Sequence, residues 1–425
     1  MEKKAFNTFS AAMLGIGCMV GVGIFIVIGL AGSIAGNLVW ISFIIGGIIA
    51  LLSGYSLAKL ALRFPSRGGI IEYLVQEYGE NSFSGALSVL FYFAQLITLA
   101  AVAKSFGEYG ARLFGYNSTF IINLFAIGVI LFFTIINLFG ASIVAKSENI
   151  IVAIKLIALI IFTIVALINI NPQYLLKNSP NPINIFFAVA LTFFAYQGYS
   201  VITNTIEDME NPQKTIIKAM FIAIGIVTLL YVSISIAVIG NLPLEEITKA
   251  KDYALAVAAK PIFGEIGFKI MAIVALISAT TAINATLYAA TEISYTLAKK
   301  GELPAIYEYN VWHSYEGLII SAILIIPMII FLNLNEITTV AALNVLIIQA
   351  LVHLGHLKLT NQTKANKFLI FLAFLLMSFI SIVSIYYYSS KNEKIIIYLI
   401  GAFLISFLIE MVLKIFTKRI VKKQT

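Results

Sequence analysis

A single lysine interrupts one long apolar stretch of this chain. Lys155 lies in ENIIVAIKLIALIIFTIVALINI and is the only charged residue between Glu148 and Lys177. A charge in the middle of a bilayer costs several kcal/mol, so such residues commonly move or bind charge. The alternative is snorkelling, because Glu148 is about 10 Å away along a helix and a lysine stem covers much of that distance. Burial favours the neutral amine, which makes Lys155 a candidate site of proton uptake and release.

Glycine is concentrated in a second apolar stretch, GIGCMVGVGIFIVIGLAG at residues 15–32. Gly17 and Gly21 form a small-xxx-small pair, so one interpretation is close helix packing. The other is an unwound helix, and FFAVALTFFAYQGYSVITNTIEDMENP at residues 186–212 favours it. That stretch has its own polar, glycine-containing patch at residues 195–198. Two interrupted helices in matching halves of a chain indicate a transporter built from inverted repeats.

The chemistry available to two such breaks follows from the backbone. Unwinding frees N–H and C=O groups, which is tolerable inside a membrane only where they line a cavity or are buried in protein. Free N–H groups at a half-helix N-terminus attract a carboxylate, and free carbonyls attract an ammonium or another cation. Two facing breaks would therefore suit a zwitterion.

The elements that must position these groups are membrane helices. The chain has 425 residues, 60% of them hydrophobic and only 11% charged, and its mean hydropathy is +0.99. This predicts an all-α integral membrane protein, residues 1–425, surrounded by a lipid bilayer and with almost no soluble domain. We expect about twelve spans, with these limits: 8–33, 38–63, 83–113, 118–140, 145–170, 183–207, 214–240, 264–299, 317–333, 336–357, 367–388 and 395–416.

Charge placement predicts the orientation and excludes other classes. Lys and Arg are more frequent in the segments that lie inside when both termini are cytoplasmic, as expected for a multi-pass protein of the cell membrane. The net charge of +8 forms no basic stripe, so we expect no nucleic-acid partner. The lone Cys18 excludes an internal disulfide. His353 and His356 lack the acidic or Cys partners of a zinc site, and no cofactor or catalytic motif is found. We therefore expect neither cofactor nor metal, and no enzyme.

Three stretches together resemble signatures of the amino acid–polyamine–organocation (APC) superfamily: GIGCMVGVGIF, FPSRGGIIEYLVQEYG and FFAYQGYSVITNTIEDMENPQK. The chain is most similar to archaeal, proton-coupled, broad-specificity amino acid transporters of the ApcT type. The resemblance implies the leucine-transporter fold. It places a first inverted repeat at residues 8–170, a second at 183–357, and two peripheral helices at 367–416.

The resemblance also implies a substrate site between the two broken helices. The substrate carboxylate would meet the backbone of Gly21, Val22 and Gly23, and the amino group would meet carbonyls near Phe193, Phe194 and Gln197. Phe194 would be the aromatic gate. Because the lining is backbone and apolar side chains, neutral amino acids are expected; the remaining residues of the site are Met19, Val20, Ile24 and Ala195. Ser200 stands where many relatives have an acidic residue, so an acidic coupling role there is unsupported.

Lys155 matches a lysine that, in transporters of the ApcT type, occupies the place of a bound sodium ion. Its ammonium would contact the carbonyl of Gly17 and a hydroxyl of Thr280 or Thr281. Together with the resemblance, these residues predict a secondary active transporter that imports amino acids with protons by alternating access, with Lys155 as the proton-coupling residue. The alternatives are sodium coupling, which Lys155 would oppose, an exchanger or facilitator, and a non-transporting amino acid sensor. Glu292 would face an inner vestibule or pair with a basic helix end.

Overall fold

The computed structural model describes residues 6–21, 23–66, 68–139, 142–176, 180–391 and 394–417, without the side chains of 142–149 and 416–417. Helices make up nearly all of this part, and the only strands in it form a short antiparallel hairpin. The helices and strands are α1 (Thr8–Met19), α2 (Gly23–Ala35), α3 (Val39–Arg63), α4 (Ile70–Tyr78), α5 (Ser82–Leu113), α6 (Thr119–Phe139), α7 (Ser142–Ile168), α8 (Pro172–Leu176), α9 (Asn184–Ala195), α10 (Val201–Asn204), α11 (Pro212–Asn241), α12 (Leu244–Lys249), α13 (Ala254–Val257), α14 (Lys260–Lys300), β1 (Asn310–Val311), β2 (Ser314–Tyr315), α15 (Glu316–Phe331), α16 (Leu334–Thr363), α17 (Lys367–Ser390) and α18 (Ile395–Thr417).

The prediction of an all-α, multi-pass membrane protein is confirmed. Within the described residues, nine helical stretches are long and apolar enough to cross a bilayer, and α1, α9 and α15 are shorter apolar helices. One of the nine stretches is α2 and α3 together, residues 23–63. Twelve spans therefore require that α1–α2 and α3 are counted as two spans and that α9–α10 and α15 are counted as one span each, so this count stays a prediction. The division into two repeats likewise stays a prediction.

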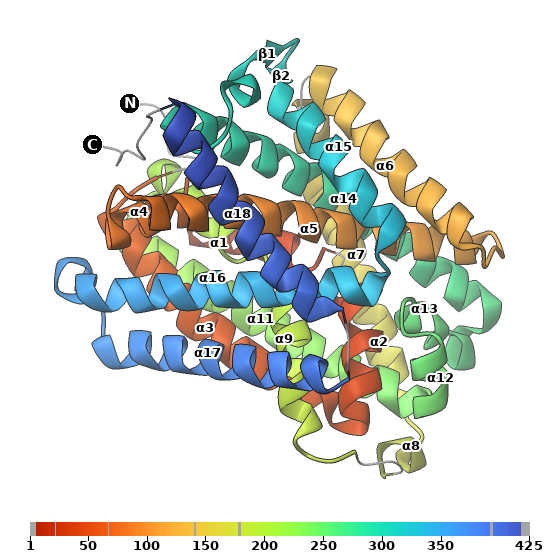
Figure 1. Cartoon of the computed structure of the whole chain (residues 1–425). Helices are drawn as coiled ribbons and strands as arrows, with labels where there is room; N and C mark the ends of the chain where they lie inside the picture. Colours follow the sequence, from red (N-terminus) through yellow and green to blue (C-terminus); the bar gives the residue numbers. More distant parts are fainter. Residues whose placement is uncertain are drawn as a thin grey trace.

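The helices differ in how deeply they are enclosed. In α5 and α16, 83% of the most apolar window is buried, whereas in α18 the share is only 22%. Figure 1 shows α18 crossing the outside of the bundle over α5 and α16. In the same view α17 lies along the lower edge of the bundle, beside α16. The outward side chains of α18 are large and apolar, such as Leu404, Phe407 and Leu408. Such a surface is stable only against lipid or another apolar partner.

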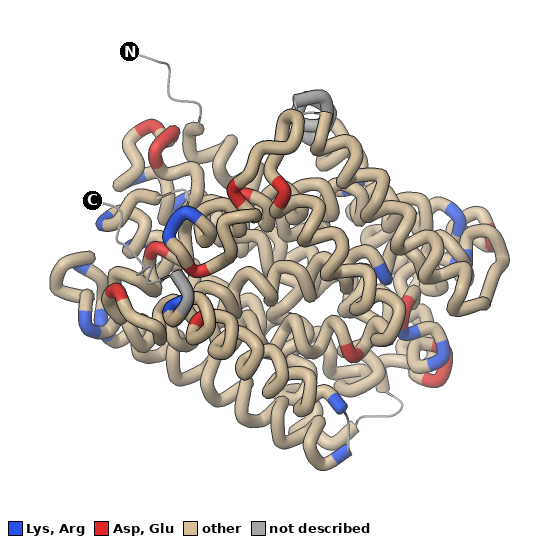
Figure 2. The backbone as a smooth tube through the Cα atoms, turned by 45° about the horizontal axis from the view of Figure 1, so that its top comes forward, with Lys and Arg blue, Asp and Glu red and all other residues tan. Residues whose placement is uncertain are grey.

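Charge is distributed as a bilayer requires. Figure 2 shows most acidic and basic residues near the two ends of the bundle and very few in the broad middle. One connection that lies at such an end, between α11 and α14, contains the short helices α12 and α13. Its backbone lies flush against α2, because a side chain on Gly29 would collide with the Lys251 carbonyl. This connection therefore covers the N-terminal broken helix as a lid.

Candidate functional site

Two helices of the bundle are interrupted where the glycine content predicted. α1 ends at Met19 and α2 begins at Gly23, while α9 ends at Ala195 and α10 begins at Val201. In the second break the chain turns tightly, because the N–H groups of Tyr196 and Gln197 donate to carbonyls only three residues back, at 3.0 Å each. Gly198 follows with φ +125°, a conformation that other residues rarely adopt.

The two breaks face one another at van der Waals distance. A Cβ atom on Gly23 would lie 2.8 Å from the Ala195 carbonyl oxygen, so the start of α2 is in contact with the end of α9. A Cβ atom on Gly198 would lie 2.9 Å from the Met19 nitrogen, so the second break is equally close to the end of α1. Glycine is required at both positions because any side chain would push the breaks apart.

A tyrosine from a third helix joins the two breaks. The Tyr231 hydroxyl of α11 is buried and donates to the Met19 carbonyl at 2.7 Å and to the Ala195 carbonyl at 3.2 Å. These are carbonyls at the ends of α1 and α9, where a helix leaves its last carbonyls without partners. Sequence reasoning missed Tyr231. Its signal was a lone phenol in the apolar stretch IVTLLYVSISI, because a buried tyrosine hydroxyl needs a polar partner.

The side chains predicted to line the site lie together around the breaks. Those of Met19, Val20, Ile24, Phe193, Phe194 and Ala195 are all buried. Gln197 is the polar member: its side-chain oxygen accepts from Gln349 of α16 at 3.4 Å, and its buried Nε2 has no hydrogen-bond partner among the described residues. A buried amide donor of this kind is available to a ligand. Val22 lies outside the described residues.

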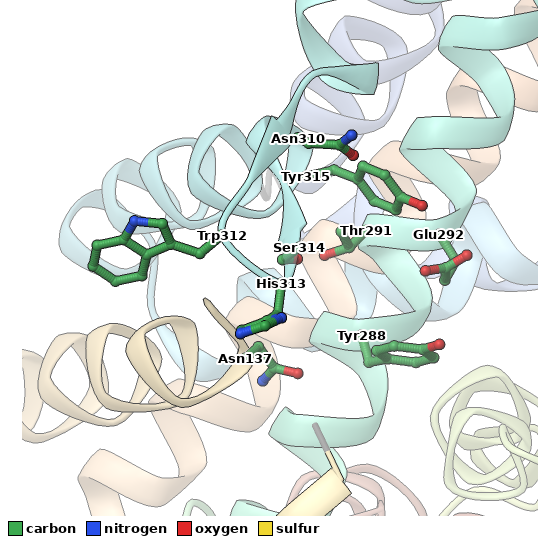
Figure 3. A pocket seen from close by; sticks show the side chains of 9 residues that line it. All are labelled: Asn137, Tyr288, Thr291, Glu292, Asn310, Trp312, His313, Ser314 and Tyr315. Atoms are coloured by element: carbon green, nitrogen blue, oxygen red, sulfur yellow. The ribbon is translucent and has the colours of Figure 1, made fainter. Parts of the chain in front are cut away.

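Most side chains that line the breaks are buried, whereas Gly23, Gln197 and Gly198 are partly exposed. Two cavities that do open to the surface lie elsewhere. One, of about 330 Å³, is lined by Asn137, Tyr288, Thr291, Glu292 and residues of the β1–β2 hairpin. Figure 3 shows Tyr288 and Glu292 on α14 along one wall of it. Glu292 is thus placed at a surface cavity rather than at the breaks.

Lys155 is fully enclosed and contacts two other helices. Its Nζ donates to the Gly17 carbonyl of α1 at 3.0 Å and lies 3.4 Å from the Thr281 hydroxyl oxygen of α14. The Thr281 hydroxyl donates to the Ser278 carbonyl, so its oxygen faces the ammonium as an acceptor. The α1 backbone packs closely here, since a Cβ on Gly17 would lie 3.0 Å from Val152.

The two candidate threonines of α14 are in different environments. Thr281 contacts Lys155, whereas the Thr280 hydroxyl donates to its own helix at Ile277. Thr280 lines the second cavity, of about 380 Å³, among aromatic and aliphatic side chains of α5 and α6. The two residues are adjacent in sequence, so they project about 100° apart around the helix. The structure therefore brings only Thr281 to Lys155.

A charged cluster at the lid was also missed. Lys104 of α5 is buried and donates to Asn123 at 2.6 Å and to the Ile329 carbonyl at 2.7 Å. One turn further, Glu108 pairs with Arg112 at 3.7 Å, and the Arg112 guanidinium lies 4.8 Å from the ring centre of Tyr253 in the lid. Burial raises the pKa of the neighbouring lid residue Asp252, against the opposing effect of Lys251. The signal in the sequence was AVAKSFGEYGARL, with three charges spaced by four in one span.

The chain is similar to known proteins over nearly its whole length. A family model described as amino acid permease matches residues 6–419. The chain is 36% identical to an uncharacterized protein of Methanocaldococcus jannaschii, over 99% of this chain and 97% of that protein. It is 32% identical to the inner membrane transport protein YbaT of Escherichia coli, over 97% of this chain and 96% of that one. It is 27% identical to the serine/threonine exchanger SteT of Bacillus subtilis, over 71% and 70% of the two chains.

Proposed function

Because the chain belongs to the amino acid permease family of the APC superfamily, we propose that this amino acid transporter imports its substrates together with protons. It is a multi-pass membrane transporter and not an enzyme. The proposal adds the driving ion, the preference for neutral amino acids, and an orientation in the cell membrane with both termini in the cytoplasm.

The paired breaks supply the substrate site. A substrate carboxylate would bind the N–H groups at Gly21, Val22 and Gly23, because the first N–H groups of a helix have no partner within it and lie at the positive end of its dipole. The substrate ammonium would bind carbonyls near Phe193, Phe194 and Gln197 at the end of α9. Apolar side chains surround both ends, which favours neutral amino acids over charged ones. Phe194 would close over the bound molecule.

Lys155 supplies the coupling. As an ammonium it joins α7 to α1 and α14 through Gly17 and Thr281. Loss of its proton leaves a neutral amine, which holds these partners less strongly because charge-assisted hydrogen bonds are about twice as strong as neutral ones. In the proposed cycle, protonation from outside stabilises the joined state. Proton release inward lets the inner half of the first broken helix move and frees the amino acid.

One observation carries this proposal: a buried lysine ammonium lies between a carbonyl at the first broken helix and a hydroxyl of α14. A bound cation would take oxygen ligands of the same kinds. The ammonium charge would repel a sodium ion there, which favours protons as the driving ion.

The test is uptake of labelled L-alanine into proteoliposomes with proton and sodium gradients imposed separately. We expect an inward proton gradient to accelerate accumulation and a sodium gradient to leave it unchanged. Lys155→Ala should abolish the response to pH. Uptake by Lys155→Ala at the wild-type rate and with the wild-type pH dependence would overturn the coupling role.

Exchange is the second candidate, because one relative is named as a serine/threonine exchanger. The same vesicles separate the two modes. An exchanger takes up labelled alanine only when the lumen holds amino acid, whereas a proton symporter also fills empty vesicles.

A further inference from the structure

An unbroken chain of buried hydrogen bonds leads away from the second break toward the end of α16. It begins at Gln349, whose amide nitrogen donates to Gln197 at 3.4 Å. The Gln349 oxygen accepts from Tyr199 at 2.6 Å, and the Tyr199 hydroxyl lies 2.8 Å from the Ser53 hydroxyl of α3. Gln349, Tyr199 and Ser53 belong neither to the predicted substrate site nor to the Lys155 contacts.

Two histidines of α16 continue the chain. His353 Nε2 lies 2.9 Å from the Ser53 hydroxyl, and His353 Nδ1 lies 2.9 Å from the Ser56 hydroxyl. The same Ser56 hydroxyl lies 2.8 Å from His356 Nδ1, and His356 Nε2 lies 2.9 Å from the Thr363 hydroxyl. Both nitrogens of both rings are therefore bonded, with a serine hydroxyl between the rings.

The chain passes from the protein interior to the end of a helix. Ser53, Ser56, His353 and His356 are fully buried, whereas Thr363 is the last residue of α16 and precedes the exposed Lys364. In the orientation proposed above, this end of α16 lies on the cytoplasmic side. One end of the chain thus contacts the substrate site, and the other approaches inner water.

We propose that Tyr199, Ser53, His353, Ser56 and His356 form a relay that carries the symported proton, once Lys155 has released it to the second break, to the cytoplasm. This deepens the proposed function and rests on it, since it supplies the inward path that proton symport needs. Histidine and hydroxyl chains are typical proton pathways inside membrane proteins. Each link lies within 2.6–3.2 Å, the reach over which a proton passes directly between heavy atoms.

The transfer balances without leaving charge behind. The single Tyr199 proton is shared between the Gln349 oxygen and the Ser53 hydroxyl, and before transfer it points to Ser53. Each later donor then points toward the cytoplasm: Ser53 to His353 Nε2, His353 Nδ1 to Ser56, Ser56 to His356 Nδ1, and His356 Nε2 to Thr363. A proton arriving at Tyr199 from a water or ammonium at the break displaces the tyrosine proton to Ser53. Each group then passes on one proton, and Thr363 releases one to water. The chain ends neutral, with every hydrogen bond reversed.

The charged and titratable groups around the histidines favour this neutral route. Lys59 of α3 faces His356, and its positive charge opposes a charged imidazolium there. Glu77 of α4 lies against α16 at Gly355, and Lys358 is its charged neighbour. Tyr78 donates to the Leu351 carbonyl, and the Tyr55 hydroxyl accepts from the Asn366 N–H at the start of α17. No carboxylate among the described residues is hydrogen-bonded to either ring.

The simplest rival role is structural, since the same bonds fasten α3 to α16. Ser56→Ala removes the hydroxyl between the two rings and leaves both histidines in place. The matched control is Ser42→Ala, because Ser42 is equally buried on α3 and donates to the Ile185 carbonyl, away from the chain. The readouts are L-alanine uptake driven by a proton gradient and L-alanine counterflow at equal pH, which needs no net proton movement.

We expect Ser56→Ala to lower proton-driven uptake at least tenfold and to leave counterflow within twofold of wild type, with Ser42→Ala normal in both. His356→Gln keeps hydrogen-bonding groups at this position, but an amide carries protons poorly. It should therefore lower proton-driven uptake and preserve counterflow as Ser56→Ala does. It replaces Ser56→Ala as the test if that variant does not fold. Equal losses in both assays, or no loss in either, would overturn the relay. If Lys155→Ala uncouples transport while both relay variants stay coupled, symport stands and the relay is wrong. If L-alanine uptake by the wild-type protein does not respond to the proton gradient, both proton symport and the relay are wrong.

Discussion

Removal of the Tyr231 hydroxyl tests the joint between the two breaks. Tyr231→Phe keeps the ring, which packs against Phe43 and Tyr196 with centroid separations of 5.8 and 5.3 Å. It deletes the donor to the Met19 and Ala195 carbonyls, which lie 2.7 and 3.2 Å away. Those carbonyls then remain in a buried environment with one partner fewer.

The size of the effect follows from the number of protons involved. A hydroxyl has one proton, so the two contacts share it and count as about one hydrogen bond, worth about 0.5–1.5 kcal/mol. Leaving the carbonyls under-satisfied moves the cost toward the upper end. About 1.4 kcal/mol corresponds to a tenfold change in an equilibrium constant. We therefore expect Tyr231→Phe to weaken L-alanine binding about tenfold.

The assay is binding of labelled L-alanine to purified protein, with thermal unfolding as the check on folding. The matched control is Tyr92→Phe, because the Tyr92 hydroxyl is equally buried and bonds to Ser321 on α15, away from the breaks. Unchanged affinity in Tyr231→Phe, or an equal loss in Tyr92→Phe, would refute the idea that this hydroxyl organises the substrate site.

Three further predictions use other contacts. Gly23→Ala should abolish L-alanine uptake, because its Cβ would lie 2.8 Å from the Ala195 oxygen. The control Gly128→Ala, which has open space around it, should transport normally. Uptake by Gly23→Ala above a tenth of the wild-type rate would contradict this prediction. Thr281→Val should weaken the response of uptake to pH because it removes an oxygen 3.4 Å from Lys155 Nζ, whereas Thr280→Val should not; equal effects on both would count against the assigned geometry. Burial, together with the nearby Glu410, raises the pKa of Glu302 to about 8, so the folded state binds a proton that the unfolded state has lost. Stability should therefore fall as pH rises from about 5 to 8, and Glu302→Gln should flatten that fall in thermal unfolding; a wild-type melting temperature that does not drop over this range would contradict the assignment.

Much of the fold was predictable because its causes are local. Length and hydropathy determine which segments cross a membrane, and glycine content at residues 15–23 and 195–198 indicated where two of them break. The contact of Lys155 with Gly17 and Thr281 was also expected, although that expectation came from a family resemblance. Without it, the residues alone left snorkelling open.

The missed features depend on segments that meet only after folding. Tyr231 bonds to Met19 across 212 residues, and Ser53 meets His353 across 300. A tyrosine, two serines and two histidines scattered over such distances show no spacing pattern, because helix packing decides their partners. The two histidines were considered only as metal ligands, since they are three positions apart on one helix. The sequence feature that could have indicated their partners is the pair of serines, Ser53 and Ser56, in the otherwise apolar helix α3.

The single thiol of the chain, Cys18, lies where the two breaks meet and can be labelled chemically. Cys18 belongs to the last turn of α1, and a Cβ on Gly198 would lie 3.0 Å from its own Cβ. Cys18 is only partly exposed in this arrangement, so a maleimide should react with its sulfur faster once the two loosened segments part. The rate of alkylation in the native sequence therefore reports how often they part. Substrates that trap the closed form should slow the labelling, and no engineered cysteine is required to see it.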